Sequence, residues 1–253
     1  TADIEVDGAM TAIMSRAINP NLMQTLEGQP VLVHAGPFAN IAIGQSSIIA
    51  DRIGLKLSDY LVTESGFGVD IGFEKFWNLK CRLSGLVPDC SVIVCTIRAL
   101  KMHGGGPEVV PGRPLDSVYT EANTAMVERG VENLIAHIDT VRKSGIPSVV
   151  CINHFHSDTE DEVAIIRRAV EERGAQCVVS RHWRYGGAGA LDLAEAVVAA
   201  CEQPSNFRFL YDRGLPLREC IERITTEVYG GDGVTYEPAA LAKLEAAERD
   251  AAL

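Results

Sequence analysis

The chain has 253 residues, of which 47% are hydrophobic and 23% charged, a composition typical of an ordinary globular protein with one large or two modest domains. Its formal net charge of −11 argues against a nucleic-acid partner, because phosphate contacts need a basic surface. No apolar run reaches the roughly 18 residues of a membrane-spanning helix, so we expect no membrane partner. The seven cysteines form no CxxC pair, which indicates the reduced thiols of a cytoplasmic protein rather than a disulfide framework or a zinc site.

The first half of the chain alternates between predicted helices and strands. The expected elements, in order, are an apolar helix over 8–18 that ends at Asn19-Pro20, a buried strand ending at His34, a helix around 48–53, a strand over 60–64, a helix that includes EKFWNLKCR, and a strand over 91–100. Residues 107–118 contain several prolines and are predicted to form an ordered surface loop.

The second half continues this alternation. A long helix is expected over roughly 119–144, followed by a strand over 148–152, a helix that ends at Gly174, a strand over 176–179 and a helix that begins near Gly186. Residues 207–211 are expected to form a short strand or an extended piece, and two amphipathic helices close the chain. Strands that alternate with helices predict an α/β fold with a mostly parallel sheet flanked by helices.

The most informative stretch is 151–187, where two short apolar runs each break abruptly into polar and aromatic residues. Ligands of open α/β sheets bind outside the carboxyl ends of the strands. Phe155 and Trp183 follow two such ends, where two flat rings can hold a flat ligand.

Three glycine-containing segments also follow predicted strands, at 34–40, 66–72 and 101–107. GFGVDIG (66–72) lies between a strand and a helix, the context of a phosphate-binding turn, but its spacing differs by one residue from the dinucleotide fingerprint. A tight turn without a ligand explains the first two segments equally well, and a flexible loop explains the third.

Other residues at strand ends allow a structural and a functional interpretation. His154 and His156 invite a metal site, although too few further ligands accompany them. Arg98 and Lys101 either meet an anionic substrate or form surface ion pairs. The sequence contains neither G-x-x-x-x-G-K-[ST] nor G-x-S-x-G, the usual signatures of nucleotide hydrolysis and of esterases.

Several longer motifs together resemble one family. HAGPFANIA, TESGFGVDIGFEKFWNLKCR, RALKMHGGGP and SRHWRYGG are similar to formate–tetrahydrofolate ligase, also called 10-formyltetrahydrofolate synthetase. PNLMQTLEG, PSNFRFLYD and TEVYGGDGV extend the resemblance across essentially the whole chain. The likeness is to a middle section of that family, so its P-loop is expected upstream of Thr1 and its closing segment downstream of Leu253.

The resemblance implies an ATP-dependent ligation with Mg²⁺, in which formyl phosphate forms and its formyl group is transferred to tetrahydrofolate. The fold it implies is a P-loop NTPase-like ligase core that here lacks its P-loop, together with a smaller α/β unit. It implies that Phe155 and Trp183 sandwich the pterin ring, and that a cleft for formyl phosphate is lined by Gly36, Pro37, Phe38, Ala39, Asn40, Gly66 and Gly68. The catalytic residues stay unassigned, because the P-loop lysine is not in this chain. A monovalent cation site is a further expectation.

The implied organisation has three parts: residues 1–130 in the nucleotide and formyl-phosphate domain, 131–235 in the folate-binding unit, and 236–253 as a helix leading to a last segment. The expected partners are small-molecule substrates together with a second copy or a chain that carries the P-loop. Compared with the family's pattern, Ile43 replaces a histidine, His154 and His156 flank Phe155, and Trp183 is followed by Arg184 and Tyr185. These departures keep open a non-catalytic folate- or nucleotide-binding module or an assembly subunit. A nicotinamide-dependent oxidoreductase that uses GFGVDIG is a more distant alternative.

Overall fold

The computed structural model describes residues 4–34 and 45–251, which belong to two compact units, Thr1–Gly85 and Leu86–Leu253. Within the described residues, no helix combines the length and the apolar character needed to cross a bilayer. The functional division at residues 130 and 235 stays a prediction; residue 130 lies inside a helix of the second unit.

The first unit begins with helix α1 (Asp7–Met14) and a hairpin of strands β1 (Asn21–Gln24) and β2 (Pro30–Val33). The two strands pair antiparallel, with Asn21 opposite Val33, and Gly28 has the positive φ that the turn requires. The strand predicted to end at His34 exists, but the prediction that it is buried is wrong: three of the four residues of β2 are exposed. A two-stranded hairpin has no neighbouring strands, so an apolar run within it need not be covered.

The rest of the first unit contains α2 (Ile48–Leu57), the π-helical segments Val69–Phe73 and Phe76–Lys80, and α3 (Cys81–Ser84). Trp77 is fully buried, and the buried ion pair between Lys80 and Asp51 (2.6 Å) joins the helical segment to α2. The predicted strand over 60–64 is wrong, since these residues pair with no described strand. An apolar run predicts burial or extension, but a strand also needs a hydrogen-bonded partner.

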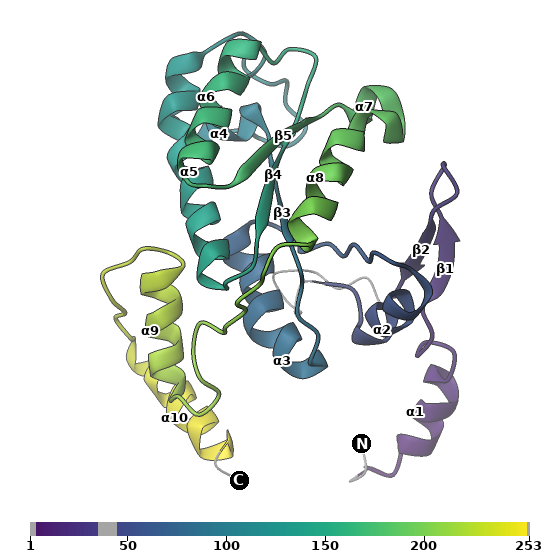
Figure 1. The fold of residues 1–253 in the computed structure, drawn as a ribbon. Helices are drawn as coiled ribbons and strands as arrows, with labels where there is room; N and C mark the ends of the chain where they lie inside the picture. Colours follow the sequence, from purple (N-terminus) through teal and green to yellow (C-terminus); the bar gives the residue numbers. More distant parts are fainter. Residues whose placement is uncertain (1–3, 35–44, 252–253) are drawn as a thin grey trace. The chain divides into compact units, whose positions relative to one another are not determined.

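The second unit is built on a parallel sheet with the strand order β3-β4-β5 (Figure 1). Its strands are β3 (Ser91–Cys95), β4 (Ser148–Asn153) and β5 (Gln176–Ser180). The register places Val92 opposite Val149 and Val150 opposite Cys177. β4 is central and buries four consecutive residues, the pattern of a strand covered on both faces. The predicted parallel α/β architecture is therefore confirmed for this unit.

The strand predicted over 91–100 is shorter than expected, because a helix begins inside it. The side chain of Thr96 accepts a hydrogen bond from the backbone N–H of Ala99 and so caps α4 (Ile97–His103). This early cap places Arg98 and Lys101 on a helix instead of at the end of the strand.

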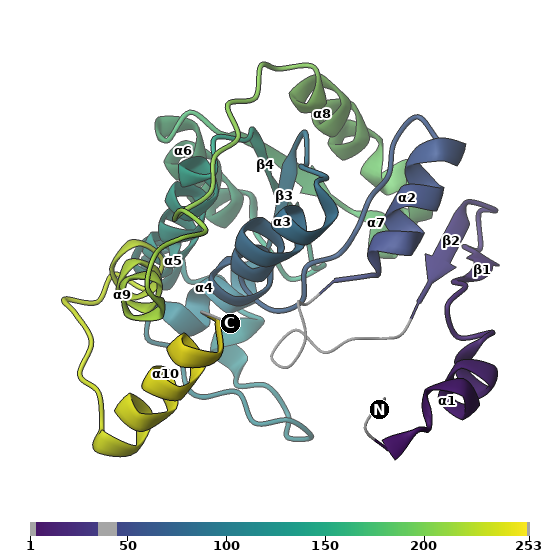
Figure 2. The same ribbon diagram turned by 90° about the horizontal axis from the view of Figure 1, so that it is seen from below.

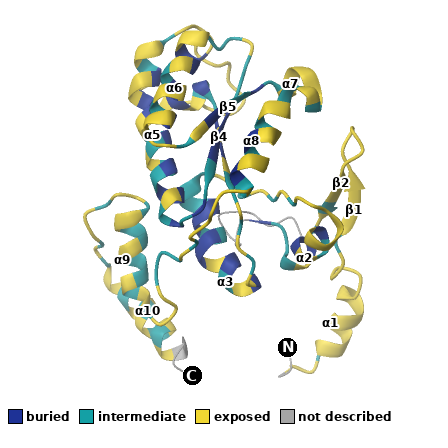
Figure 3. Ribbon diagram, in the orientation of Figure 1, coloured by how far each residue is buried: buried dark blue, intermediate teal, exposed yellow. Residues whose placement is uncertain are grey.

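Helices cover both faces of the sheet. α5 (Thr124–Lys143) and α6 (Glu160–Glu172) lie on one face, and α8 (Leu191–Cys201) lies on the other (Figures 1 and 2). Ala196 and Ala200 of α8 pack on Val149, which brings this helix close to the sheet. Within the second unit, Figure 3 shows many buried residues in β4 and in α5. Each large aliphatic side chain buried there contributes about 1.5–3 kcal/mol.

Gly104 of the 101–107 segment and Gly130 of α5 allow close packing between helices. A Cβ on Gly104 would lie 2.0 Å from the carbonyl oxygen of Met126, and one on Gly130 would lie 1.8 Å from that of Leu100. α4 and α5 can approach this closely only with glycine at both positions. The interpretation of this segment as a flexible loop is therefore wrong at Gly104.

The C-terminal part holds α9 (Leu217–Glu227) and α10 (Pro238–Ala251), as the amphipathic patterns predict. Residues 207–211 form no strand, and the alternative of an extended piece stays a prediction; next to Asn206, whose N–H bonds to the carbonyl of Gly145, Arg208 N–H bonds to the carbonyl of Ser144. All seven cysteines are free thiols. Burial raises the pKa of Cys95 to about 12 and that of Cys177 to about 11, which makes both thiols unreactive at neutral pH.

Candidate functional site

The first part of the site is the turn at which the chain leaves β4. His154 N–H still bonds to the carbonyl of Ser180, which extends the sheet by one step. The carboxylate of Asp158 then accepts a hydrogen bond from Phe155 N–H (2.8 Å), and Asp158 N–H bonds back to the carbonyl of Phe155 (3.0 Å). This pair of bonds fixes the backbone that carries the half-buried Phe155 ring.

Arg98 lies against this turn. Its guanidinium carbon is 4.1 Å from the centroid of the Phe155 ring, and its Nη2 donates a long hydrogen bond to Ser157 Oγ (3.4 Å). The phenylalanine that the sequence predicts as a stacking residue already has one flat cationic group over its ring.

Helix α6 begins directly after this turn with a capping box. Thr159 Oγ1 accepts a bond from Glu162 N–H, and Glu162 in turn accepts one from Thr159 N–H (3.1 Å). The T-x-x-E spacing of Thr159 and Glu162 carries the signal for this cap in the sequence.

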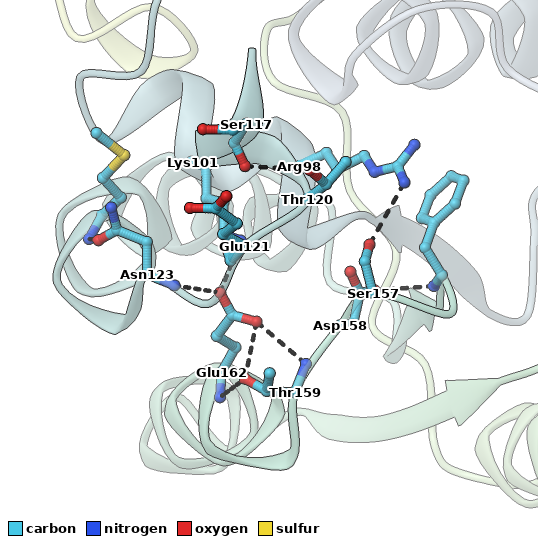
Figure 4. A network of polar contacts seen from close by, with 12 residues as sticks. Arg98, Lys101, Ser117, Thr120, Glu121, Asn123, Ser157, Asp158, Thr159 and Glu162 are labelled. Carbon is cyan, nitrogen blue, oxygen red and sulfur yellow. Dashed lines mark hydrogen bonds and ion pairs between the residues drawn. The ribbon is translucent and has the colours of Figure 1, made fainter. Parts of the chain in front are cut away.

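Glu162 is also the partner of Lys101. Their side chains are 0% and 1% exposed, and Lys101 Nζ lies 2.8 Å from Glu162 Oε1 (Figure 4). Lys101 Nζ also donates to the carbonyl of Glu121, and Asn123 N–H donates to Glu162 Oε1. The prediction of a surface ion pair for Lys101 is wrong in location, because the pair it makes is buried and joins α4 to α6.

The pKa values of the two carboxyl groups next to the turn are shifted in opposite directions. Burial raises the pKa of Asp158, and this effect exceeds the opposing effects of the Phe155 N–H and of the nearby His154 and Arg98. Burial acts on Glu162 in the same direction, but the hydrogen bonds from Lys101, Asn123 and Thr159 outweigh it and hold its pKa below the ordinary value.

The second part of the site is the turn after β5, which carries Trp183 on the short helix α7 (His182–Tyr185). Ser180 is fully buried and shares a hydrogen bond with His182 Nδ1 (2.9 Å), while Arg181 N–H bonds to the carbonyl of Gly189 (2.8 Å). A Cβ on Gly189 would lie 2.5 Å from the Arg181 carbonyl oxygen, so the segment closes on itself only with glycine there.

Trp183 itself is 90% exposed. An aromatic ring of this size on a hydrogen-bonded turn leaves a large apolar surface in contact with water, and such surfaces mark binding sites. Phe155 and Trp183 lie just beyond the carboxyl ends of the neighbouring parallel strands β4 and β5. Among the described residues no direct ring contact joins them. The structure places both rings as the sequence predicts, and their stacking on a ligand stays a prediction.

The GFGVDIG segment belongs to the first unit. Phe67 has φ +62° and is 71% exposed, and a Cβ on Gly72 would lie 2.0 Å from the carbonyl oxygen of Gly66. Close packing within the turn thus explains Gly72 without a ligand. Phosphate binding at Gly66 and Gly68 stays a prediction. Gly36, Pro37, Phe38, Ala39, Asn40 and Ile43 lie outside the described residues.

Metal ligands do not gather in the described part of the chain: no group of three or more His, Cys, Asp and Glu side chains has the arrangement to hold a metal ion. The described residues therefore do not fit a Mg²⁺ site of their own.

Comparison with known proteins defines the class of this chain. The family described as Formate--tetrahydrofolate ligase matches residues 1–252. Three proteins named formate--tetrahydrofolate ligase are similar: one of Dehalococcoides mccartyi is 67% identical over 96% of this chain, one of Lawsonia intracellularis 64% over 99%, and one of Desulfotalea psychrophila 62% over 99%. The chain spans 41%, 42% and 45% of the lengths of these relatives. It belongs to the formate–tetrahydrofolate ligase family, an enzyme family, as the sequence motifs predict.

Proposed function

We propose that this chain takes part in the ATP-dependent ligation of formate to tetrahydrofolate, which yields 10-formyltetrahydrofolate. The observation that carries this proposal is the pair of aromatic residues beyond β4 and β5, with Trp183 90% exposed, in a chain of this family. Two neighbouring strand ends that each present a flat ring match a flat heterocycle such as the pterin of tetrahydrofolate.

The chemistry proceeds through formyl phosphate. A formate oxygen attacks the γ-phosphorus of ATP and ADP leaves; the N10 amine of tetrahydrofolate then attacks the formyl carbon, phosphate leaves and the amine loses its proton. Formate is a poor acyl donor until its oxygen becomes part of a phosphate leaving group. The mixed anhydride must be kept from water until transfer. Magnesium bound to ATP supplies charge neutralisation during phosphoryl transfer.

The roles of this chain's residues follow from that scheme. Phe155 and Trp183 stack on the pterin and orient N10, while Gly66 and Gly68 contribute backbone to the phosphate side, together with the 36–40 segment. The core is a P-loop NTPase-like ligase fold whose phosphate-binding lysine comes from a segment outside residues 1–253. The ligation then needs those further segments, from the same polypeptide or from a partner, in the cytoplasm; a second copy and a monovalent cation complete the proposed assembly.

A second candidate is a folate-binding module without ligase activity. Two sequence features favour it: Ile43, where the family pattern has a histidine, and the histidines that flank Phe155. In this case the aromatic pair binds tetrahydrofolate, but no formyl phosphate is formed.

A reconstitution assay separates the two candidates. The chain is incubated with formate, MgATP and tetrahydrofolate, alone and together with the remaining segments of the Dehalococcoides mccartyi relative. Ligase function predicts formate-dependent 10-formyltetrahydrofolate only in the mixture, with a raised KM for tetrahydrofolate in Trp183→Ala. Binding of tetrahydrofolate without product in the mixture supports the module, and an unchanged KM in Trp183→Ala contradicts the proposed site.

A further inference from the structure

Helix α4 contacts the Phe155 turn and the helix after it through two cations. Arg98 and Lys101 are three residues apart and therefore lie on the same face of α4. Arg98 contacts the Phe155 ring near the start of the 154–162 segment. Figure 4 shows its bond to Ser157 and the contact of Lys101 with Glu162 at the end of the segment. One helix face thus holds both ends of the segment that carries the stacking ring.

The Lys101 contact is the rigid one. Its ion pair with Glu162 is fully buried, and Glu162 receives further hydrogen bonds from Asn123 and Thr159. Because a buried charge that loses its partner is costly, this cluster strongly resists displacement of α6 relative to α4. It thereby fixes the start of α6, which directly follows the Phe155 turn.

The Arg98 contact is of a different kind. Among the described residues Arg98 forms no ion pair with a carboxylate, and its buried Nε has no hydrogen-bond partner. What holds the guanidinium is the Phe155 ring at 4.1 Å and the long bond to Ser157. A planar guanidinium stacks flat on an aromatic face, which a lysine ammonium cannot do. Arg98 therefore contacts the ring directly, and its electrostatic effect on the nearby Asp158 carboxyl group is the smallest of those that shift the pKa of that group.

We propose that Arg98 is a positioning residue for folate binding: its guanidinium covers one face of Phe155 and fixes the ring, so that the pterin stacks on the opposite face. This inference rests on the proposed folate site. A phenyl ring has two faces, and a group whose central carbon is 4.1 Å from the centroid excludes a second flat ring from the same face. A ring held before the ligand arrives also loses less side-chain freedom on binding.

The test is a titration of the 253-residue chain with tetrahydrofolate, followed by tryptophan fluorescence. Arg98→Met keeps much of the side-chain length but removes the flat cation, and we expect binding to weaken about five- to tenfold, the range of a partly desolvated cation–π contact. Arg98→Lys keeps the charge and is expected to weaken binding by about twofold. Arg142→Met is the matched control, since Arg142 lies at the end of α5 and pairs with Asp139.

A double-variant cycle shows whether Arg98 acts through the ring. In a Phe155→Leu background the further change Arg98→Met is expected to have no effect on the dissociation constant, because the ring on which Arg98 acts is gone. An effect of unchanged size in that background would mean that Arg98 contacts the ligand itself, and would overturn the positioning role. Equal binding by Arg98→Met and the unsubstituted chain would overturn it as well.

The folding of each variant and the binding of tetrahydrofolate by the unsubstituted chain separate failure of this inference from failure of the proposed function. Far-UV circular dichroism of each variant shows whether it is folded; if Arg98→Met is not, Arg98→Lys in the same cycle decides the question. If the unsubstituted chain fails to bind tetrahydrofolate, the proposed function has failed and this inference falls with it. If the chain binds and the Arg98 variants bind equally well, only the inference has failed.

Discussion

Replacing Lys101 by methionine tests the buried cluster that joins α4 to α6. The substitution keeps an unbranched side chain of similar length and leaves Glu162 without its cation. Because Glu162 is 0% exposed, water cannot replace the lost partner without opening the structure. We therefore expect a large loss in the free energy of unfolding.

The size of the loss follows from the remaining partners of Glu162. Removal of one member of a buried ion pair costs about 3–5 kcal/mol. Glu162 keeps three hydrogen bonds, from Asn123 N–H (2.9 Å), Thr159 N–H (3.1 Å) and Thr159 Oγ1 (2.8 Å), which favours the lower end of this range. Lys101 also gives up its bond to the carbonyl of Glu121, a net contribution of about 1 kcal/mol. The expected total is about 3–4 kcal/mol.

Urea unfolding followed by far-UV circular dichroism measures this loss, and amide hydrogen exchange locates it. The exchange should accelerate in α4 and α6 more than in the first unit. The double variant Lys101→Met with Glu162→Gln removes both charges and should recover most of the stability. A loss below about 1 kcal/mol, the size of a surface pair, would refute the claim that this pair is buried and uncompensated.

Three further outcomes follow from the same contacts. The pKa of Glu162 is lowered in the folded chain, so its contribution to stability is fully present above the pKa of Glu162 in the unfolded chain and is lost as the pH falls through the folded-state pKa. Urea midpoints measured from neutral to acid pH should fall accordingly. In Glu162→Gln the midpoint should depend less on pH. The pKa of Asp158 is raised, so its ionised carboxylate lowers the stability at neutral pH. Asp158→Asn keeps an acceptor for Phe155 N–H and should raise the urea midpoint at neutral pH but not in acid. An equal gain at both pH values would contradict the raised pKa of Asp158. Gly130→Ala places a Cβ 1.8 Å from a carbonyl of α4 and should cost at least about 1–3 kcal/mol in urea unfolding, whereas Gly214→Ala, with open space around it, should cost little; equal effects would refute the close packing.

The sequence predicts well those elements whose pattern reflects local rules or complete burial. β4 is a continuous apolar run in the sequence because both of its faces are covered. The start of α6 is marked in the sequence by its capping residue Thr159, and its end by Gly174, which has a positive φ. Phe155 and Trp183 are found for the same reason, since a buried strand that ends in polar and aromatic residues marks the edge of the sheet where ligands bind.

Features that depend on distant partners are not predictable in this way. Residues 60–64 have the composition of a strand but pair with no strand in the described part of the chain, and strand pairing is not a local property. The contact of Arg98 with Phe155 joins residues 57 positions apart, and the burial of Glu162 depends on Lys101 of another helix. Glu162 reads in the sequence as one of several acidic residues in the first turn of a helix, so only the T-x-x-E spacing distinguishes it.

Trp183 is the residue proposed to bind the pterin of tetrahydrofolate. A fluorescence titration of the chain with tetrahydrofolate, compared with Trp183→Phe, tests it most directly, because Trp77 is fully buried in the first unit and supplies a constant background. If the pterin binds on Trp183, the chain shows saturable quenching that disappears in Trp183→Phe. Quenching of equal size in that variant, or none in the unsubstituted chain at millimolar ligand, would contradict it.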